Sequence, residues 1–251
     1  MEGDSLAWRT HDLESPKKGF KLIVGVPDVG LVGPIAASFL IKSLNLKLIA
    51  YFDSDDMPPL LLFHEAKPLL PVRVYGSGEL CVFISEIAIS PRVMPSLARA
   101  IIDWATKKGA SGIIALSGIP VPNRIEIQNP KVYGAAVKPE DREFLKKSGI
   151  ELLKEGFMSG VHALVLKECL VKEISGIALL AEAYMNYPDP GAAASLVSTL
   201  GSLFGIDVDV SPLKEQEEEI RIKLRELMKR TVETMRQAGK EYEYTLPAMY
   251  A

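Results

Sequence analysis

The chain has 251 residues, of which 48% are hydrophobic and 24% charged, a composition typical of a soluble globular protein with one large domain or two small ones. The net charge of −3, without a basic stripe that carries aromatic residues, predicts no nucleic-acid partner. No apolar run approaches the roughly 20 residues that span a bilayer, and residues 1–12 lack the apolar segment of a signal peptide. We therefore expect no membrane partner and a cytoplasmic location.

From residue 21 onward, apolar runs with β-branched residues alternate with segments of helical periodicity. The first half of the chain predicts helices over 33–44 and 93–108 and strands over 21–26, 47–52, 60–64, 70–75, 79–86 and 112–116. The strands between residues 60 and 86 follow one another in hairpin style, so we expect this part of the sheet to be antiparallel.

The second half of the chain continues the alternation after an irregular segment that begins near Gly118. The pattern predicts short strands and helices in the order strand 131–137, helix 139–148, helix 161–169, strand 174–182 and helix 191–204. Strands that alternate with helices predict an α/β fold, in which a central, mainly parallel sheet is flanked by helices on both faces.

The last forty residues differ from the rest of the chain. Pro212 marks a boundary, and residues 213–238 have the pattern of one long helix, with acidic first turns and basic last turns that suit the helix dipole. We therefore divide the chain into an α/β domain over 1–212, a C-terminal helix over 213–239 and a flexible tail over 240–251. The helix can pack on the domain or on a neighbouring subunit through the stripe of Ile220, Leu224, Leu227 and Met228.

A glycine-rich segment from Gly25 to Gly33 follows the first strand. Its spacing, G-x-x-x-x-G-x-x-G with Pro27 inside, does not match a dinucleotide-binding loop, and it lacks the Lys and Ser/Thr of a P-loop. A phosphate at the following helix N-terminus is physically possible. The favoured interpretation is that the glycines let the strand, the turn and the helix pack closely.

The sequence offers no constellation of catalytic or metal-binding residues. The histidines, His11, His64 and His162, are scattered without metal-ligand spacing, and His162 is expected to be a core residue. Ser117 and Ser159 lie in turns that suit a nucleophile, but no sequence neighbour would activate them. We therefore predict that the protein is not an enzyme and has no catalytic residues, no cofactor and no metal.

Two further groups of residues have structural interpretations. Cys81 and Cys169 lie inside apolar runs and are predicted to be reduced core residues. The carboxylates of Asp53, Asp55 and Asp56 suit weak cation binding, but the segment lacks the glycine and the distal glutamate of an EF-hand loop. A solvated loop is the favoured interpretation of this segment.

The chain ends in Met249-Tyr250-Ala251, a hydrophobic-Tyr-any tripeptide with a free carboxylate. A tripeptide on a mobile tail can enter a pocket on another protein, where a lysine or backbone N–H groups receive the carboxylate and the phenol fills a slot. The tripeptide resembles the C-terminal motif with which proteasome activators and assembly factors dock between α-subunits of the 20S ring. We therefore predict Met249, Tyr250 and Ala251 as the partner-binding residues.

Four stretches of the chain together match one family. They are residues 25–36, 117–120, 156–160 and 182–190, with the sequences GVPDVGLVGPIA, SGIP, GFMSG and EAYMNYPDP. These stretches resemble the PAC2 family of proteasome assembly chaperones and their archaeal homologues, over roughly residues 20–220. The resemblance implies a phosphorylase-like or hydrolase-like α/β sandwich without the catalytic apparatus. It also implies a homo-oligomer, a tetramer or pentamer, whose C-terminal segments reach the proteasome α-ring.

The resemblance and the C-terminal tripeptide support one hypothesis. The protein is an ATP-independent assembly chaperone or activator-like factor, whose several tails bind the α-ring through avidity. An alternative is an enzyme on the phosphorylase-like scaffold, which predicts a pocket with convergent polar groups near Gly30 and Ser117. A third hypothesis is a binding module for another protein that also receives a C-terminal carboxylate.

Overall fold

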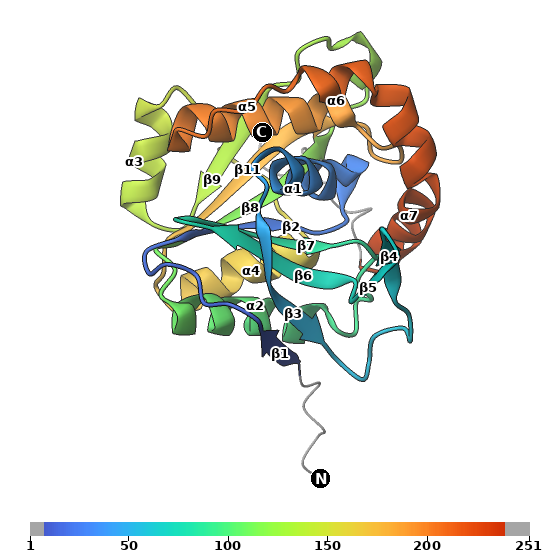
Figure 1. Ribbon diagram of the computed structural model, residues 1–251. Helices are drawn as coiled ribbons and strands as arrows, with labels where there is room; N and C mark the ends of the chain where they lie inside the picture. Colours follow the sequence, from blue (N-terminus) through green and yellow to red (C-terminus); the bar gives the residue numbers. More distant parts are fainter. Residues whose placement is uncertain (1–7, 239–251) are drawn as a thin grey trace.

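The computed structural model describes residues 8–238, and their strands form a central sheet with helices on both faces (Figure 1). Within these residues the sheet has nine strands in the order β1-β3-β6-β7-β2-β8-β11-β9-β10. Their bounds are β1 Arg9–Asp12, β2 Lys21–Gly25, β3 Lys47–Asp53, β6 Val72–Ser77, β7 Leu80–Ser85, β8 Gly112–Pro120, β9 Val132–Ala136, β10 Glu151–Leu152 and β11 Gly176–Ala183.

The centre of the sheet is parallel and its flanks are mostly antiparallel. Strands β7, β2, β8 and β11 run parallel to one another. Strands β1, β3, β6 and β7 pair in antiparallel fashion on one side, and β9 pairs antiparallel with β11 on the other before β10 joins it in parallel. The α/β class is therefore confirmed, but the sheet is mixed and not mainly parallel, since its flanking strands pair in antiparallel fashion. The expected antiparallel section is confirmed for β6 and β7, over residues 72–85.

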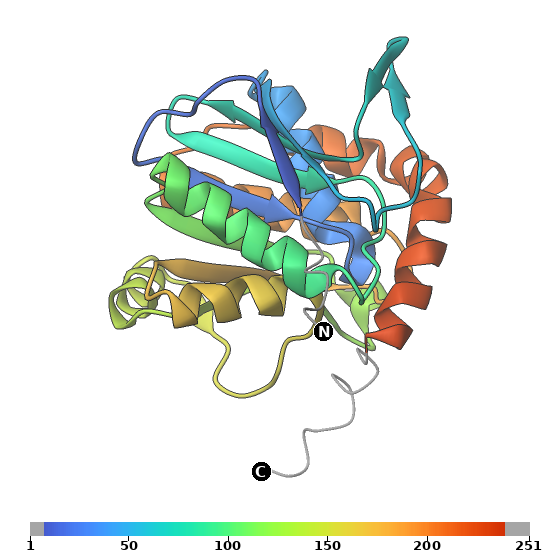
Figure 2. The ribbon, with the colours of Figure 1, turned by 90° about the horizontal axis from the view of Figure 1, so that it is seen from below.

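The helices form the outer layers of the molecule (Figures 1 and 2). One face of the sheet is covered by α2 (Met94–Lys108) and α4 (Gly160–Val171). The other face carries α1 (Val32–Ser43), α3 (Pro139–Lys147), α5 (Pro190–Phe204), α6 (Ser211–Glu215) and α7 (Glu217–Gln237). Each face buries its own cluster of apolar side chains, as expected for parallel strands that are covered on both sides.

The glycines after β2 are required for close packing, which confirms the structural interpretation of this segment. A Cβ on Gly25 would lie 2.6 Å from the Cβ of Ala37, and a Cβ on Gly33 would lie 2.4 Å from the carbonyl oxygen of Leu116. Gly30 has a φ of +60°, which an L-residue rarely adopts. Helix α1 therefore crosses β2 and β8 at a distance that side chains would not permit.

Three local predictions were wrong. Strand β1 was not predicted, because its four residues are all exposed and it has no apolar face. The strand expected over 60–64 is shorter, and with the unpredicted β5 (Lys67–Leu69) it forms a separate hairpin as β4 (Leu62–His64). The helix expected over 213–238 is interrupted at Gln216, since α6 lies along α5 while α7 runs down the side of the molecule (Figure 1).

Replacing Gly33 by alanine is expected to lower the free energy of unfolding by about 1–3 kcal/mol, because the methyl group would collide with backbone in a packed layer. Urea denaturation measures the change. Ser38→Ala is the matched control, since Ser38 lies on the exposed side of the same helix and its replacement should change stability by less than about 0.5 kcal/mol. Equal stability of the two variants would contradict the packing argument.

Both cysteines are free and buried, and burial raises the pKa of the Cys81 thiol and of the Cys169 thiol to about 12. The thiolate is the reactive form, so neither residue should react with iodoacetamide in the folded protein at pH 8. Mass spectrometry should show two labels only after unfolding in guanidinium. Rapid labelling of the folded chain would contradict the buried position of these side chains.

Candidate functional site

The tripeptide Met249 to Ala251 lies outside the described residues, so the structure does not place it. The motif stretches predicted from the sequence meet at the carboxyl ends of the parallel strands. The backbone of Gly30 donates to the carbonyl oxygen of Met185 at 3.4 Å and accepts from the N–H of Asp189 at 2.8 Å. The glycine segment after β2 and the segment after β11 are therefore joined directly.

Three buried polar side chains gather beside this junction. The hydroxyl of Ser117 donates to Oδ2 of Asp28 at 2.7 Å, and Nδ1 of His162 lies 3.1 Å from the same oxygen. Asp28, Ser117 and His162 are 4%, 2% and 1% exposed, so the group lies beneath the surface. An ionised carboxylate only accepts hydrogen bonds, so His162 donates from Nδ1 and its Nε2 is left without a hydrogen-bond partner in the described structure.

This arrangement differs from a nucleophile with its base. In a serine hydrolase the serine donates to the histidine, which then takes its proton. Here the serine and the histidine both donate to Asp28, so the hydrogen-bond partner of Ser117 is a carboxylate and not the imidazole. The alternative hypothesis predicted convergent polar groups near Gly30 and Ser117. They do converge, and all three side chains are buried and hydrogen-bonded to one another through Asp28.

A buried ion pair holds the segment after β11. Nε and Nη2 of Arg124, in the η2 turn (Arg124–Glu126), donate to the two carboxylate oxygens of Asp189 at 2.7 and 2.8 Å. Asp189 is fully buried and also accepts from the backbone N–H groups of Tyr184 and Ala192. The same carboxylate therefore caps α5, fixes the end of β11 and neutralises a buried guanidinium.

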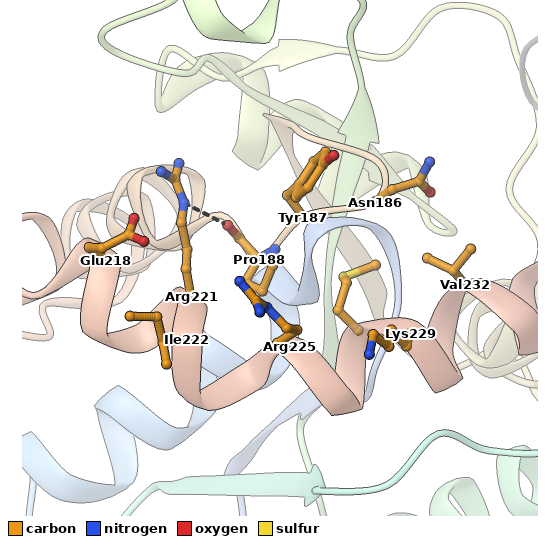
Figure 3. Close-up of a pocket in the computed structure, with 10 residues that line it drawn as sticks. Asn186, Tyr187, Pro188, Glu218, Arg221, Ile222, Arg225, Lys229 and Val232 are labelled. Carbon is orange, nitrogen blue, oxygen red and sulfur yellow. Dashed lines mark hydrogen bonds between the residues drawn. The ribbon is translucent and has the colours of Figure 1, made fainter.

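Helix α7 is attached to this edge by a tyrosine. The guanidinium carbons of Arg124 and Arg221 lie 5.0 and 5.5 Å from the ring centroid of Tyr184, within the range of cation–π attraction. Nε of Arg221 also donates to the carbonyl oxygen of Pro188 at 3.3 Å (Figure 3). The start of α7, which leads toward the C-terminal tail, is thereby tied to the motif segment after β11.

A groove of about 730 Å³ runs between that segment and α7 (Figure 3). Tyr187 forms part of one wall and is 68% exposed, while Arg221, Arg225 and Lys229 lie four residues apart along the helix wall. Glu218 is the acidic residue among those that line it. Arg221 and Lys229 are paired with Glu217 and Glu226 on the same helix, so the groove combines an exposed aromatic ring with cations that are largely neutralised.

Residues 8–238 bear on the metal sites and the membrane-spanning segments that the sequence was searched for. No cluster of three metal-ligating side chains occurs there, and no helix among these residues is long and apolar enough to cross a membrane. The carboxylates of Asp53 and Asp55 are paired with Arg9, and that of Asp56 lies 3.3 Å from Arg92, so arginines already neutralise the carboxylates of this loop.

The protein is thus an α/β protein whose motif segments are joined at one edge of the sheet by hydrogen bonds and a buried ion pair. The C-terminal helix α7 is attached to this edge. A model of the PAC2 family matches residues 22–228, and the chain belongs to that family.

Relatives of the chain share most of its length. An uncharacterized protein of Methanocaldococcus jannaschii is 34% identical over 221 residues, which are 88% of this chain and 90% of that protein. Pyrococcus furiosus PbaA, described as an archaeal homolog of proteasome-assembly chaperone, is 32% identical over 90% of this chain and 99% of its own, with a TM-score of 0.85. Pyrococcus furiosus PbaB, described as an archaeal proteasome activator, shares the fold at 24% identity over 88% of this chain and 99% of its own, with a TM-score of 0.74.

The two arginines that organise this edge, Arg124 and Arg221, could not be identified from the sequence. Arg124 was assigned to an irregular segment, and Arg221 to a helix that the sequence left free to pack within the chain or between chains. A charged residue in a loop gives no sequence signal of burial, because its partner, Asp189, is 65 residues away. The motif around Asp189 was recognised, but its ion pair was not.

Replacing Asp189 by asparagine is expected to lower the free energy of unfolding by about 3–5 kcal/mol, because it leaves the Arg124 guanidinium buried without a counter-charge. Asparagine still caps a helix well, so the change tests mainly the ion pair. Urea denaturation of Asp189→Asn, Arg124→Met and the double variant measures the coupling. Glu143→Gln, which breaks an exposed pair with Lys146, is the control and should leave stability unchanged.

Proposed function

We propose that the protein is an ATP-independent proteasome assembly chaperone or activator-like factor. The observation that carries the proposal is the likeness to PbaA, an archaeal homolog of proteasome-assembly chaperone, over 90% of this chain at 32% identity. Membership of the PAC2 family supports the same role. Because no nucleotide-binding loop was found in the sequence, the work of the protein must come from binding energy.

The proposed docking element is Met249-Tyr250-Ala251, which enters a pocket between α-subunits of the 20S ring. The mounting of α7 supports this role. Met228, Thr231 and Met235 are at most 4% exposed, so the C-terminal half of the helix is packed against the body of the protein. The helix ends at Gln237, two residues after the buried Met235, so the proposed docking element follows a helix whose last turns are packed.

One tripeptide supplies little affinity, so the proposed complex depends on several tails. A homo-oligomer presents several copies of Ala251 at once, and each further contact is then an intramolecular event at high effective concentration. The proposed partners are thus the proteasome α-ring and further copies of the chain itself.

The proposal is tested by surface plasmon resonance of the full-length chain on an immobilised proteasome α-ring. Tyr250→Ala is expected to weaken binding tenfold or more. The reason is that the loss of a buried aromatic anchor costs about 2 kcal/mol of binding free energy, and about 1.4 kcal/mol corresponds to a factor of ten. Tyr244→Ala is the matched control, since it removes a tyrosine from the same tail outside the tripeptide and should bind like the original chain.

A second arm tests the terminal carboxylate. A chain with one glycine added after Ala251 should also bind weakly, because the carboxylate is displaced from the cation or N–H groups that receive it. Undiminished binding by Tyr250→Ala or by the extended chain would refute the tripeptide as the docking element. A full-length chain that does not bind the ring would refute the proteasome role.

A further inference from the structure

The hairpin of β4 and β5 projects from the body of the protein (Figure 2). Its strands pair with each other and with no other strand of the described residues. A two-stranded hairpin has little stability of its own in water. The turn residues Glu65 and Ala66 both have positive φ, of 49° and 62°, so this short hairpin is also locally strained.

The two faces of the hairpin differ in what they contact. Successive residues of a strand point to opposite faces, and Leu62 and His64 lie on the face that lines a groove in the same chain. Phe63 is on the other face, 69% exposed, and Leu61, just before the strand, is 52% exposed. Two large, exposed apolar side chains, one on a projecting hairpin and one just before it, are typical of an interaction surface.

The groove beside the hairpin is itself apolar and open, with a volume of about 810 Å³. It lies between α1, the hairpin and the segment formed by α6 and α7, because α7 is packed tightly only through its C-terminal half. Ile35, Leu213, Leu224 and Leu227 supply its apolar walls. An uncovered apolar groove and an uncovered apolar hairpin face therefore lie on the same side of one molecule.

The charges around these two surfaces are complementary. Lys42 lines the groove and has no ion-pair partner in residues 8–238, whereas the carboxylate of Glu86 is already bound by the buried Arg73. The hairpin turn carries Glu65, which also lacks a partner within the described chain. A hairpin that entered the groove from another molecule could bring Glu65 to Lys42 while it buried its apolar face.

We propose that the Phe63 face of the hairpin docks in the Ile35–Leu224 groove of a second copy of this chain. A single molecule cannot make the contact, since its own Phe63 lies on the face opposite Leu62 and His64. Two different surfaces meet, so the contact continues from copy to copy and closes into a ring if the rotation permits. The inference rests on the self-association in the proposed function and names the surface that produces it.

The first test is the mass of the full-length chain in solution, measured by size-exclusion chromatography with light scattering. The original chain is expected to be an oligomer, and Phe63→Glu to elute with the mass of a monomer. Ile125→Glu is the matched control, because Ile125 is 82% exposed elsewhere on the surface and its change should leave the mass unaltered. Thermal denaturation verifies that both variants are folded.

The second test is a charge exchange. Glu65→Lys is expected to weaken self-association about three- to tenfold, the effect of losing a surface ion pair and gaining a repulsion. Lys42→Glu combined with Glu65→Lys should restore it. A double variant as weak as the single one would place the contact elsewhere.

Both tests measure self-association of the chain without any proteasome. A result that refutes the docking of the hairpin therefore leaves the proposed binding to the α-ring untested by these experiments. If the original chain has the mass of a monomer, or of a monomer with a bound small molecule, a second copy does not occupy the groove and the inference is refuted. Phe63→Glu that remains an oligomer refutes the hairpin as the interface. In that case the effect of Tyr250→Ala on ring binding still decides the proposed function.

Discussion

The carboxylate of Asp189 is the group on which the carboxyl edge of this protein depends. It is fully buried, yet it meets a guanidinium and two backbone N–H groups, so its charge and its lone pairs are satisfied. Its own backbone N–H binds Gly30 of the segment after β2. One residue thus connects the η2 turn, the end of β11, the start of α5 and the glycine segment.

The same edge carries the connection between the core and the C-terminal region. Tyr184 is fixed through its backbone by Asp189, and its ring receives both Arg124 and Arg221. A chain of contacts thereby runs from the sheet to α7, which precedes the tail. In the proposed function this rigidity has a physical purpose, because tails that start from fixed points lose less entropy when several of them bind one ring.

The buried polar network and the exposed apolar surface of this molecule differ in whether their partners lie within the same chain. Asp28, Ser117 and His162 are polar and enclosed, and their hydrogen bonds hold α4 to the turn before α1. Phe63 and Leu61 are apolar and exposed, beside an apolar groove. The first arrangement is complete within one chain, whereas the second leaves apolar surface that nothing in residues 8–238 covers.

The sequence by itself determined the α/β class, most helices and strands, the packing role of the glycines and the family, because these depend on local periodicity, on the size of residues and on motifs of adjacent residues. Only the tertiary structure decided the pairing of Arg124 with Asp189, the attachment of α7 through Arg221, and the break at Gln216. Strand β1 and strand β5 likewise emerged only in three dimensions, since neither has a buried apolar face for a sequence pattern to record. Contacts between residues far apart in the chain depend on how the layers stack, and no short stretch of sequence contains that information.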